Sequence, residues 1–308
     1  MAEEDYLFSG LKVLDVGTWI AGPVAATILA DFGADVIKVE MPELGDAYRR
    51  LSGLPALPDA EANYMWEMDA RNKRSLTLNL KSEKGMAILH RLIRTCDVYI
   101  TNHPLPMRRA LKLTYDDVRP LNDRMIYASL TAYGEEGPDR DREGFDLVAY
   151  WARSGLMDLV RSGDAQPAPA LPGMGDHPTA VSLYAGIVTA LLKRERTGRG
   201  GQVHTSLIAN GLWSASCIAQ GGFAGGSFQN FRAARRRPAF TRNLYETKDL
   251  RWLQFTMVRT QSDVEHLLAA VGLGGLLEDE RFTTPEGRAE HVELLVHLVQ
   301  ELIRDRDS

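Results

Sequence analysis

Residues 11–40, LKVLDVGTWIAGPVAATILADFGADVIKVE, contain the pattern that decides the fold. The apolar run at 11–16 is typical of a buried strand. Residues 22–33 have the apolar spacing of a helix, with a proline in the first turn and a glycine past the end. Residues 34–40 predict a second strand. Strand, helix and strand within about 30 residues form a βαβ unit, whose two strands are parallel.

The same alternation continues along the chain. Strands are expected at 75–80, 97–102 and 125–134, with an amphipathic helix at 82–96 and a short helical piece at 114–122. Because parallel strands need crossover helices, we expect an α/β fold with a parallel sheet and helices on both of its faces.

Further elements are expected to complete this first domain. We predict helices at 145–160, 178–198 and 209–220, and a strand at 201–207. Basic residues in the last turn of the long helix and the glycine that follows it are typical of a helix end. The first, larger domain is therefore assigned to residues 1–220.

Residues 221–243 have a different character, because they are rich in Gly, Arg and Phe without a clear period. We predict a linker or a mobile functional loop there. A β-hairpin is expected at 244–258 and helices at 262–277 and 287–305. These elements form a second, smaller α+β domain, residues 244–308.

Composition limits the possible functions of the 308 residues. The net charge of −5 disfavours a nucleic-acid-binding protein. Two cysteines are too few for a disulfide framework and indicate reduced thiols. The acidic start lacks a signal core, and no apolar run approaches the ~18 residues that a membrane span needs. We therefore expect a cytoplasmic protein with no membrane or nucleic-acid partner.

Two common kinds of site are disfavoured by spacing. Glu40 ends the second strand, as in dinucleotide-binding proteins, but Gly17 and Gly22 do not form the G-x-G-x-x-G pattern. A generic phosphate or nucleotide site at the first helix N-terminus stays open. The histidines and cysteines have no metal-ligand spacing, so we expect no metal and no tightly bound cofactor.

Basic residues surround two of the predicted strands. If the turns that carry these basic residues converge at the carboxyl ends of parallel strands, their positive charges suit a phosphate-bearing ligand. Taken alone, the basic residues are typical of the solvated flanks of a strand. The residues are Lys73, Arg74 and Lys81 around the first strand and Arg108, Arg109 and Lys112 after the second.

One acid, Asp176, lies in the glycine-rich stretch GMGDHPTA. With Pro178 at the first helical position, Asp176 or His177 could cap the helix. Alternatively, the positive helix end could keep Asp176 ionised, and Gly173 and Gly175 could let a carbonyl approach it for nucleophilic attack. A polar loop at 132–146 carries six further acids, which could include a catalytic pair or form a solvated surface. Sequence physics leaves these alternatives open.

Seven blocks of the sequence occur in a familiar order. They are LKVLDVGTWIAGPVAATILADFGADVIKVEMPELGD, NKRSLTLNLKSEKG, DVYITN, YASLTAYGEEGP, GFDLVAYWARSGL, GMGDHPTAVSLYAGIVTALLKRERTGRGGQV and RWLQFTM. Over about residues 10–290, the sequence resembles family III CoA-transferases of the formyl-CoA and carnitine-CoA type.

The resemblance implies a Rossmann-like large domain that binds CoA, a smaller domain and an interlocked homodimer. It implies CoA transfer from an acyl-CoA donor to a carboxylic acid acceptor, with Asp176 as a nucleophile that forms a covalent aspartyl intermediate. It also implies a set of CoA contacts. These are Ile20, Ala21, Leu78, Asn79, Lys81, Asn102, His103, Arg109 and Phe145.

The chain departs from the family pattern at several positions. Met41 and Ala110 stand where an arginine is common, so Arg108 or Arg109 would have to replace the latter. Phe145 stands where the related acyl-CoA racemases have a catalytic histidine, which favours the transferase unless His177 takes its place.

The chain also ends within the second domain, before the family's last segment. We therefore expect a fragment or a naturally short form. A racemase-like enzyme that acts on 2-methylacyl-CoA and a non-catalytic CoA-binding short paralogue remain the alternatives to the transferase.

Overall fold

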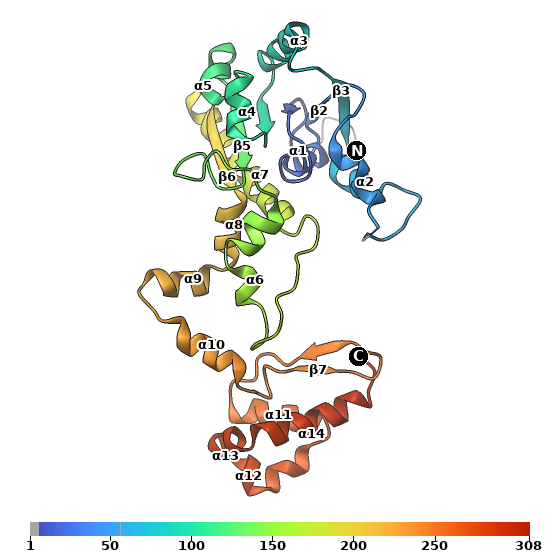
Figure 1. Ribbon diagram of the computed structural model, residues 1–308, viewed down its shortest axis with the longest axis vertical. Coiled ribbons are helices and arrows are strands. Elements are labelled where there is room, and N and C mark those ends of the chain that lie inside the picture. Colours follow the sequence, from blue (N-terminus) through green and yellow to red (C-terminus); the bar gives the residue numbers. More distant parts are fainter. Residues whose placement is uncertain (1–5, 56) are drawn as a thin grey trace. The chain divides into compact units, whose positions relative to one another are not determined.

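The computed structural model describes residues 6–55 and 57–308, which form two compact units (Figure 1). The first unit comprises residues 1–161 and 166–224, and the second comprises 162–165 and 225–308. The first half of the acidic start lies outside the described residues. Among the helices of the described part, none combines the length and apolar character needed to cross a membrane.

The first unit is built on a six-stranded sheet, which confirms the α/β class. Its strand order is β3-β2-β1-β4-β5-β6, and every neighbouring pair is parallel. Consecutive connections leave in opposite directions from β1 and β4, where such sheets bind ligands beyond the carboxyl ends of the strands. The strands are β1 (Lys12–Asp15), β2 (Asp35–Glu40), β3 (Lys73–Thr77), β4 (Val98–Thr101), β5 (Ile126–Thr131) and β6 (Gly201–Ser206).

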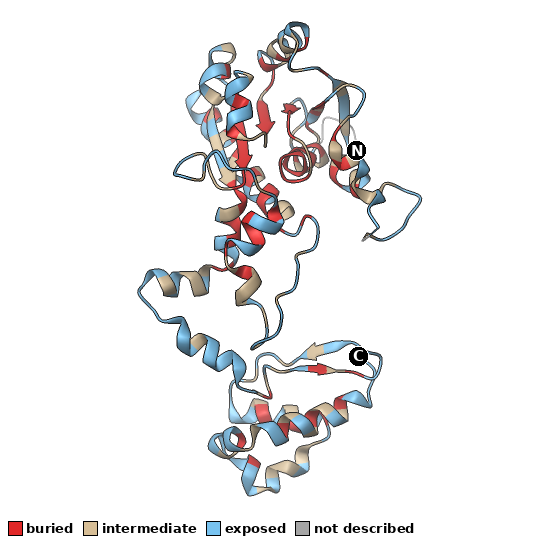
Figure 2. Ribbon diagram, in the orientation of Figure 1, coloured by how far each residue is buried: buried red, intermediate tan, exposed pale blue. Residues whose placement is uncertain are grey.

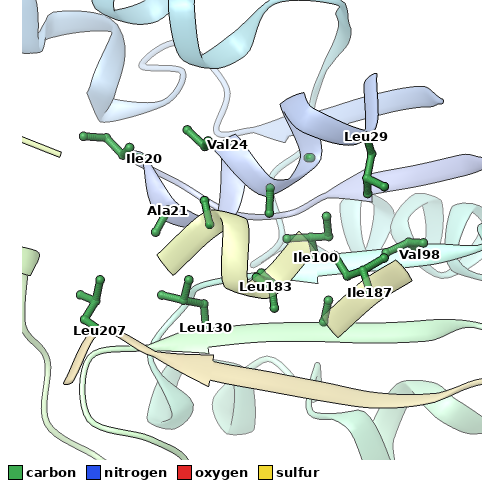
Figure 3. Close-up of a cluster of buried hydrophobic side chains, with 14 of the residues drawn as sticks. Ile20, Ala21, Val24, Leu29, Val98, Ile100, Leu130, Leu183, Ile187 and Leu207 are labelled. Atoms are coloured by element: carbon green, nitrogen blue, oxygen red, sulfur yellow. The ribbon is translucent and has the colours of Figure 1, made fainter. Parts of the chain in front are cut away.

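Alternate strand residues feed separate cores on the two faces of the sheet. Val98 and Ile100 pack on one face, against α1 (Ala21–Asp31) and α7 (Asp176–Thr197), as Figure 3 shows. The strands and α1 are largely buried (Figure 2). Tyr99 packs on the opposite face, with apolar side chains of the helices there. Those helices are α3 (Glu83–Ile93) and α5 (Tyr115–Val118). Between them in the chain lies α4 (Leu105–Ala110), and a 3-10 turn at Arg119–Leu121 follows α5.

The long helix α7 begins two residues before the expected start. Gly175 is its N-cap residue, and Asp176 is already helical, so of the two alternatives for Asp176 the structure rules out capping by Asp176 or His177. The other end agrees with the sequence: Gly198 adopts a φ of 72°, and its N–H donates to the carbonyl oxygen of Arg194.

Two other expected helices of the first unit are interrupted. The segment 145–160 forms a π-helix at Leu147–Ala152 and a short helix, α6, because Gly155 adopts a φ of 88° between them. The segment 209–220 is divided between α8 and α9. The remaining helices of this unit are α2 (Tyr64–Ala70), α6 (Leu156–Leu159), α8 (Leu207–Ser214), α9 (Ser216–Phe223) and the 3-10 turn Ala47–Gly53.

The second unit combines a hairpin with helices around a separate core that includes Tyr245, Phe282 and Leu295. Part of the expected linker is helical, because the Ser227 hydroxyl caps α10. The expected helix at 287–305 is broken at His291. The elements are α10 (Phe228–Arg236), β7 (Leu244–Glu246), β8 (Trp252–Gln254), α11 (Gln261–Ala270), a 3-10 turn (Gly274–Glu278), α12 (Glu280–Thr283), α13 (Pro285–Glu290) and α14 (Val292–Arg304).

Candidate functional site

A cavity of about 870 Å³ lies beyond the carboxyl ends of the strands in the first unit. Loops that follow β1 to β5 form its wall, together with Asp176 at the start of α7. Its volume lies within the usual range for small-molecule sites. All the residues that the resemblance assigns to CoA line this cavity, except Arg109. They are Ile20, Ala21, Leu78, Asn79, Lys81, Asn102, His103 and Phe145.

The two arginines expected to replace a family arginine have other partners. Arg109 is exposed and forms an ion pair with Asp141 at 2.9 Å. Arg108 is buried, and its guanidinium donates to the His103 carbonyl oxygen and the Tyr127 hydroxyl. Neither side chain lines the cavity. The basic residues that do so are Arg50, Lys81, Arg140 and Arg142.

Lys73 and Arg74 also lie away from the cavity. They begin β3, at the opposite end of the strand from the ligand crevice. Arg74 pairs with Asp35 at the surface, whereas Lys73 is buried and its ammonium lies 2.8 Å from Asp15. These two residues support the fold, and only Lys81 of this basic group reaches the cavity wall.

A buried cluster of two acids and two lysines adjoins the cavity, and its Asp46 also lines the cavity wall. Lys38 lies 2.9 Å from Asp46 and 3.7 Å from Asp15, while Lys73 contacts Asp15 from the other side. Burial alone would raise the pKa of Asp15, but the two ammonium groups lower it below its usual value. Sequence reasoning did not identify Lys38 and Asp46 as members of a buried ion cluster. The one sequence signal for this cluster was a lysine, Lys38, within an otherwise apolar strand.

The loop after β1 is fixed by side chains from distant segments. Asn102 accepts from the Thr18 amide at 2.8 Å and donates to the Thr18 carbonyl oxygen at 2.7 Å. Trp19 adopts a left-handed φ of 62°, and its amide donates to Asp46 at 3.0 Å. Its ring meets that of Phe145 edge-to-face, with 5.5 Å between centroids. The cavity wall therefore contains a constrained loop, a common feature of functional sites.

Gly173 and Gly175 have a packing role beside Asp176. A Cβ on Gly175 would lie 2.5 Å from Tyr150, and one on Gly173 would lie 2.7 Å from the His177 ring. Gly173 also has a φ of 75°, which disfavours other residues. The structure accounts for both glycines by these contacts with the protein, whereas the sequence suggested an approach route for a substrate.

The half-buried Asp176 is surrounded mainly by negative charge. Burial raises its pKa to about 7, and so do the carboxylates of Asp146 and Asp69, whereas His177 lowers it. Burial and the two acidic neighbours therefore act against the ionisation that the positive helix end was expected to favour.

Asp146, Asp69 and Tyr48 hold the surroundings of Asp176 and His177 in place, and sequence reasoning had not assigned a role to any of them. Asp146 accepts from the Gly175 amide at 3.0 Å and so fixes the start of α7. Asp69 accepts from Tyr48 at 2.6 Å and lies 3.0 Å from His177 Nε2. The six acids of the polar loop included Asp146, but nothing in the sequence separated it from its neighbours.

Comparison with known proteins places this arrangement in a family. Residues 8–308 match the sequence profile described as CoA-transferase family III. The chain is 32% identical over 301 residues to (R)-2-hydroxy-4-methylpentanoate CoA-transferase of Clostridioides difficile, covering 97% of this chain and 75% of that protein. It is 32% identical over 300 residues to cinnamoyl-CoA:phenyllactate CoA-transferase of Clostridium sporogenes, covering 95% and 72%.

The solved structures agree with the sequence matches. A CaiB/BaiF family protein from Brucella suis superposes with a TM-score of 0.82 at 27% identity, covering 98% of this chain and 79% of that one. Profile, relatives and fold thus point to one assignment, which also fits a half-buried acid that lines a cavity at the switch point of the sheet. The chain belongs to CoA-transferase family III.

Proposed function

We propose that this protein transfers CoA from an acyl-CoA donor to a carboxylic acid acceptor, with Asp176 as the nucleophile. The observation that carries the proposal is the position of Asp176 in the wall of the cavity formed by the loops after the parallel strands. A carboxylate in such a position can attack a thioester that enters the cavity.

The chemistry conserves the energy of the thioester through covalent steps. A carboxylate oxygen of Asp176 attacks the acyl carbon, the C–S bond breaks, and CoA leaves as a thiolate from a mixed anhydride. The thiolate attacks the aspartyl carbon, which releases the donor acid and leaves an aspartyl-CoA thioester. The acceptor carboxylate displaces the thiolate from this thioester, and the thiolate then attacks the acceptor acyl carbon. The last step forms the new acyl-CoA and restores Asp176.

The cavity wall supports both halves of a CoA thioester. Ile20, Ala21 and Phe145 offer apolar surface, whereas Lys81 and Arg50 supply cations for phosphate groups. Relatives are named for acids as different as phenyllactate and glutarate, which share only the carboxylate. We therefore define the acceptor as a carboxylic acid, with the rest of the molecule left open.

The proposal extends to assembly and location. The resemblance implies an interlocked homodimer, and the exposed apolar side chains of Val181, Leu192, Trp213 and Phe223 support burial against a second copy. The free thiols of Cys96 and Cys217 fit a reducing cytoplasm. Light scattering coupled to size exclusion tests the dimer: a monomeric mass at micromolar concentration would remove this part of the proposal.

Trapping of the aspartyl thioester tests the function. After incubation with acyl-CoA, hydroxylamine converts an aspartyl thioester to a hydroxamate, which peptide mass spectrometry locates. We expect the mark at residue 176 in the wild type and in the matched control Asp116→Asn, an exposed acid on α5, and its absence in Asp176→Asn. CoA binding without any mark would support the non-catalytic CoA-binding alternative.

The racemase alternative requires a second acid–base group at the α-carbon. Both ring nitrogens of His177 already face acceptors, Gly173 and Asp69, which supports the transferase. Deuterium exchange at the α-carbon of a 2-methylacyl-CoA, without any acceptor acid, would favour the racemase instead.

A further inference from the structure

The ring of His177 is held between two hydrogen-bond acceptors. Nδ1 lies 2.9 Å from the Gly173 carbonyl oxygen, and Nε2 lies 3.0 Å from Oδ1 of Asp69. A carbonyl oxygen can only accept, and Oδ2 of Asp69 already accepts the Tyr48 hydroxyl proton at 2.6 Å. With Asp69 as an acceptor at both oxygens, both ring nitrogens of His177 donate, which is the pattern of an imidazolium.

Burial gives a second reason for the positive charge. Asp69 is 3% exposed, and a carboxylate removed from water needs a cation. Among the ion pairs of residues 6–55 and 57–308, the partner of Asp69 is His177. The hydrogen bond to Asp69 accordingly raises the pKa of His177 above its usual value.

Two acids and one cation surround Asp176. Asp146 precedes the π-helix, and Asp69 lies on α2; both raise the pKa of Asp176. Tyr48, in the 3-10 turn, faces the same acids and stays neutral because burial, Asp69, Asp176 and Asp46 raise its pKa above the working range. His177 is therefore the cation that opposes the two acids around Asp176.

We propose that His177 is a positioning residue which, held as a cation by Asp69 and Tyr48, keeps the Asp176 carboxylate charged near neutral pH. This inference rests on the proposed role of Asp176 as nucleophile. Neither His177 nor Asp69 lines the cavity, whereas Asp176 does. The positive charge thus acts from behind the wall, where it supports ionisation of the attacking group without contacting the substrate.

Titration of Asp176 tests this role independently of turnover. Carbon-13 NMR of labelled aspartate carboxyls, with the Asp176 signal assigned by its loss in Asp176→Asn, gives the ionisation midpoint. His177→Gln should raise that midpoint by about one pH unit, because a neutral amide replaces the cation. His177→Lys should restore it towards the wild-type value, and His266→Gln, an exposed control in the second unit, should leave it unchanged.

The pH profile of CoA transfer gives the second measurement. The acidic limb of His177→Gln should move upward with the Asp176 midpoint, so that kcat falls about tenfold near pH 6 and stays within about twofold of wild type near pH 9. A purely structural role would lower kcat equally at all pH values. An unmoved midpoint in a folded His177→Gln protein, with or without such a uniform loss, overturns the inference.

The two measurements also separate this inference from the proposed function. A midpoint that moves as expected, in a protein whose residue 176 is never acylated, supports the electrostatic role of His177 and contradicts the nucleophile assignment alone. Acylation of residue 176 together with an unmoved midpoint supports the nucleophile assignment and contradicts the electrostatic role of His177.

Discussion

Two groups of buried or half-buried acids in the same unit have opposite electrostatic balance. The first group, Asp15 and Asp46, shares two lysines, Lys38 and Lys73, and we call it the balanced group. The second group, formed by Asp69, Asp146 and Asp176, has one imidazole, that of His177, and we call it the unbalanced group. The pKa of Asp15 is lowered against the effect of burial, whereas the pKa of Asp176 is raised to about 7.

The difference separates structure from chemistry. An acid with matched cations stays ionised over a wide pH range and holds segments together. An acid that burial and neighbouring carboxylates bring close to neutral pH can change its charge during a reaction cycle, which is typical of functional sites. Charge balance around each acid, more than its burial, therefore distinguishes the two roles.

Removal of the carboxylate at the unbalanced group should give the largest effect. Asp176→Asn keeps the shape but cannot form the anhydride, so kcat for CoA transfer should fall by about 10⁴-fold or more. Steady-state assays of freshly prepared protein measure this, since slow deamidation would restore activity. A loss below about tenfold would mean that Asp176 is not the nucleophile.

Removal of a lysine from the balanced group should affect stability instead. Lys38→Met leaves Asp15 and Asp46 buried with one cation fewer, which should cost about 3–5 kcal/mol of unfolding free energy. Arg74→Met is the matched control, because it breaks an exposed pair worth less than about 1 kcal/mol. Urea titrations compare the two variants, and equal losses would contradict the contrast between the acid groups.

The unbalanced group should reduce stability when it ionises. The folded-state pKa of Asp176, about 7, lies above its ordinary value of 3.8. The folded protein therefore holds a proton that the unfolded chain has lost, and stability falls as pH rises between these values. Asp176→Asn should be more stable than wild type by up to about 4 kcal/mol near pH 8 and about equal to it near pH 3. Greater stability of the wild type at both pH values would contradict the raised pKa.

Basic residues at the cavity should show the smallest effects. Lys81 lines the cavity and is exposed, whereas Arg109 lies outside it and is paired with Asp141. Lys81→Ala should raise KM for acyl-CoA by about three- to tenfold at unchanged kcat, because it removes one phosphate contact. Arg109→Ala should change KM less than about twofold. The reverse order would place the phosphate site outside the cavity.

Local patterns in the sequence predicted the sheet, whereas the choice of Asp176 as candidate nucleophile came from the resemblance to a family. Apolar runs and helix-end glycines placed the first strands and Gly198, because these signals depend on neighbours within a few residues. The pairing of Asp69 with His177 joins segments 108 residues apart, and a lone acid on a short helix has no local signature. The acidic surroundings of Asp176 had no local signature for the same reason, because Asp69 and Asp146 come from distant segments.

Transfer of oxygen from substrate to protein tests the central claim most directly. In a single turnover with an acceptor acid labelled with oxygen-18 in its carboxylate, the final attack of the thiolate leaves one labelled oxygen on the nucleophile. We predict that the peptide carrying Asp176 gains about 2 Da and that other acidic peptides do not. Turnover with an unlabelled Asp176 would contradict the account.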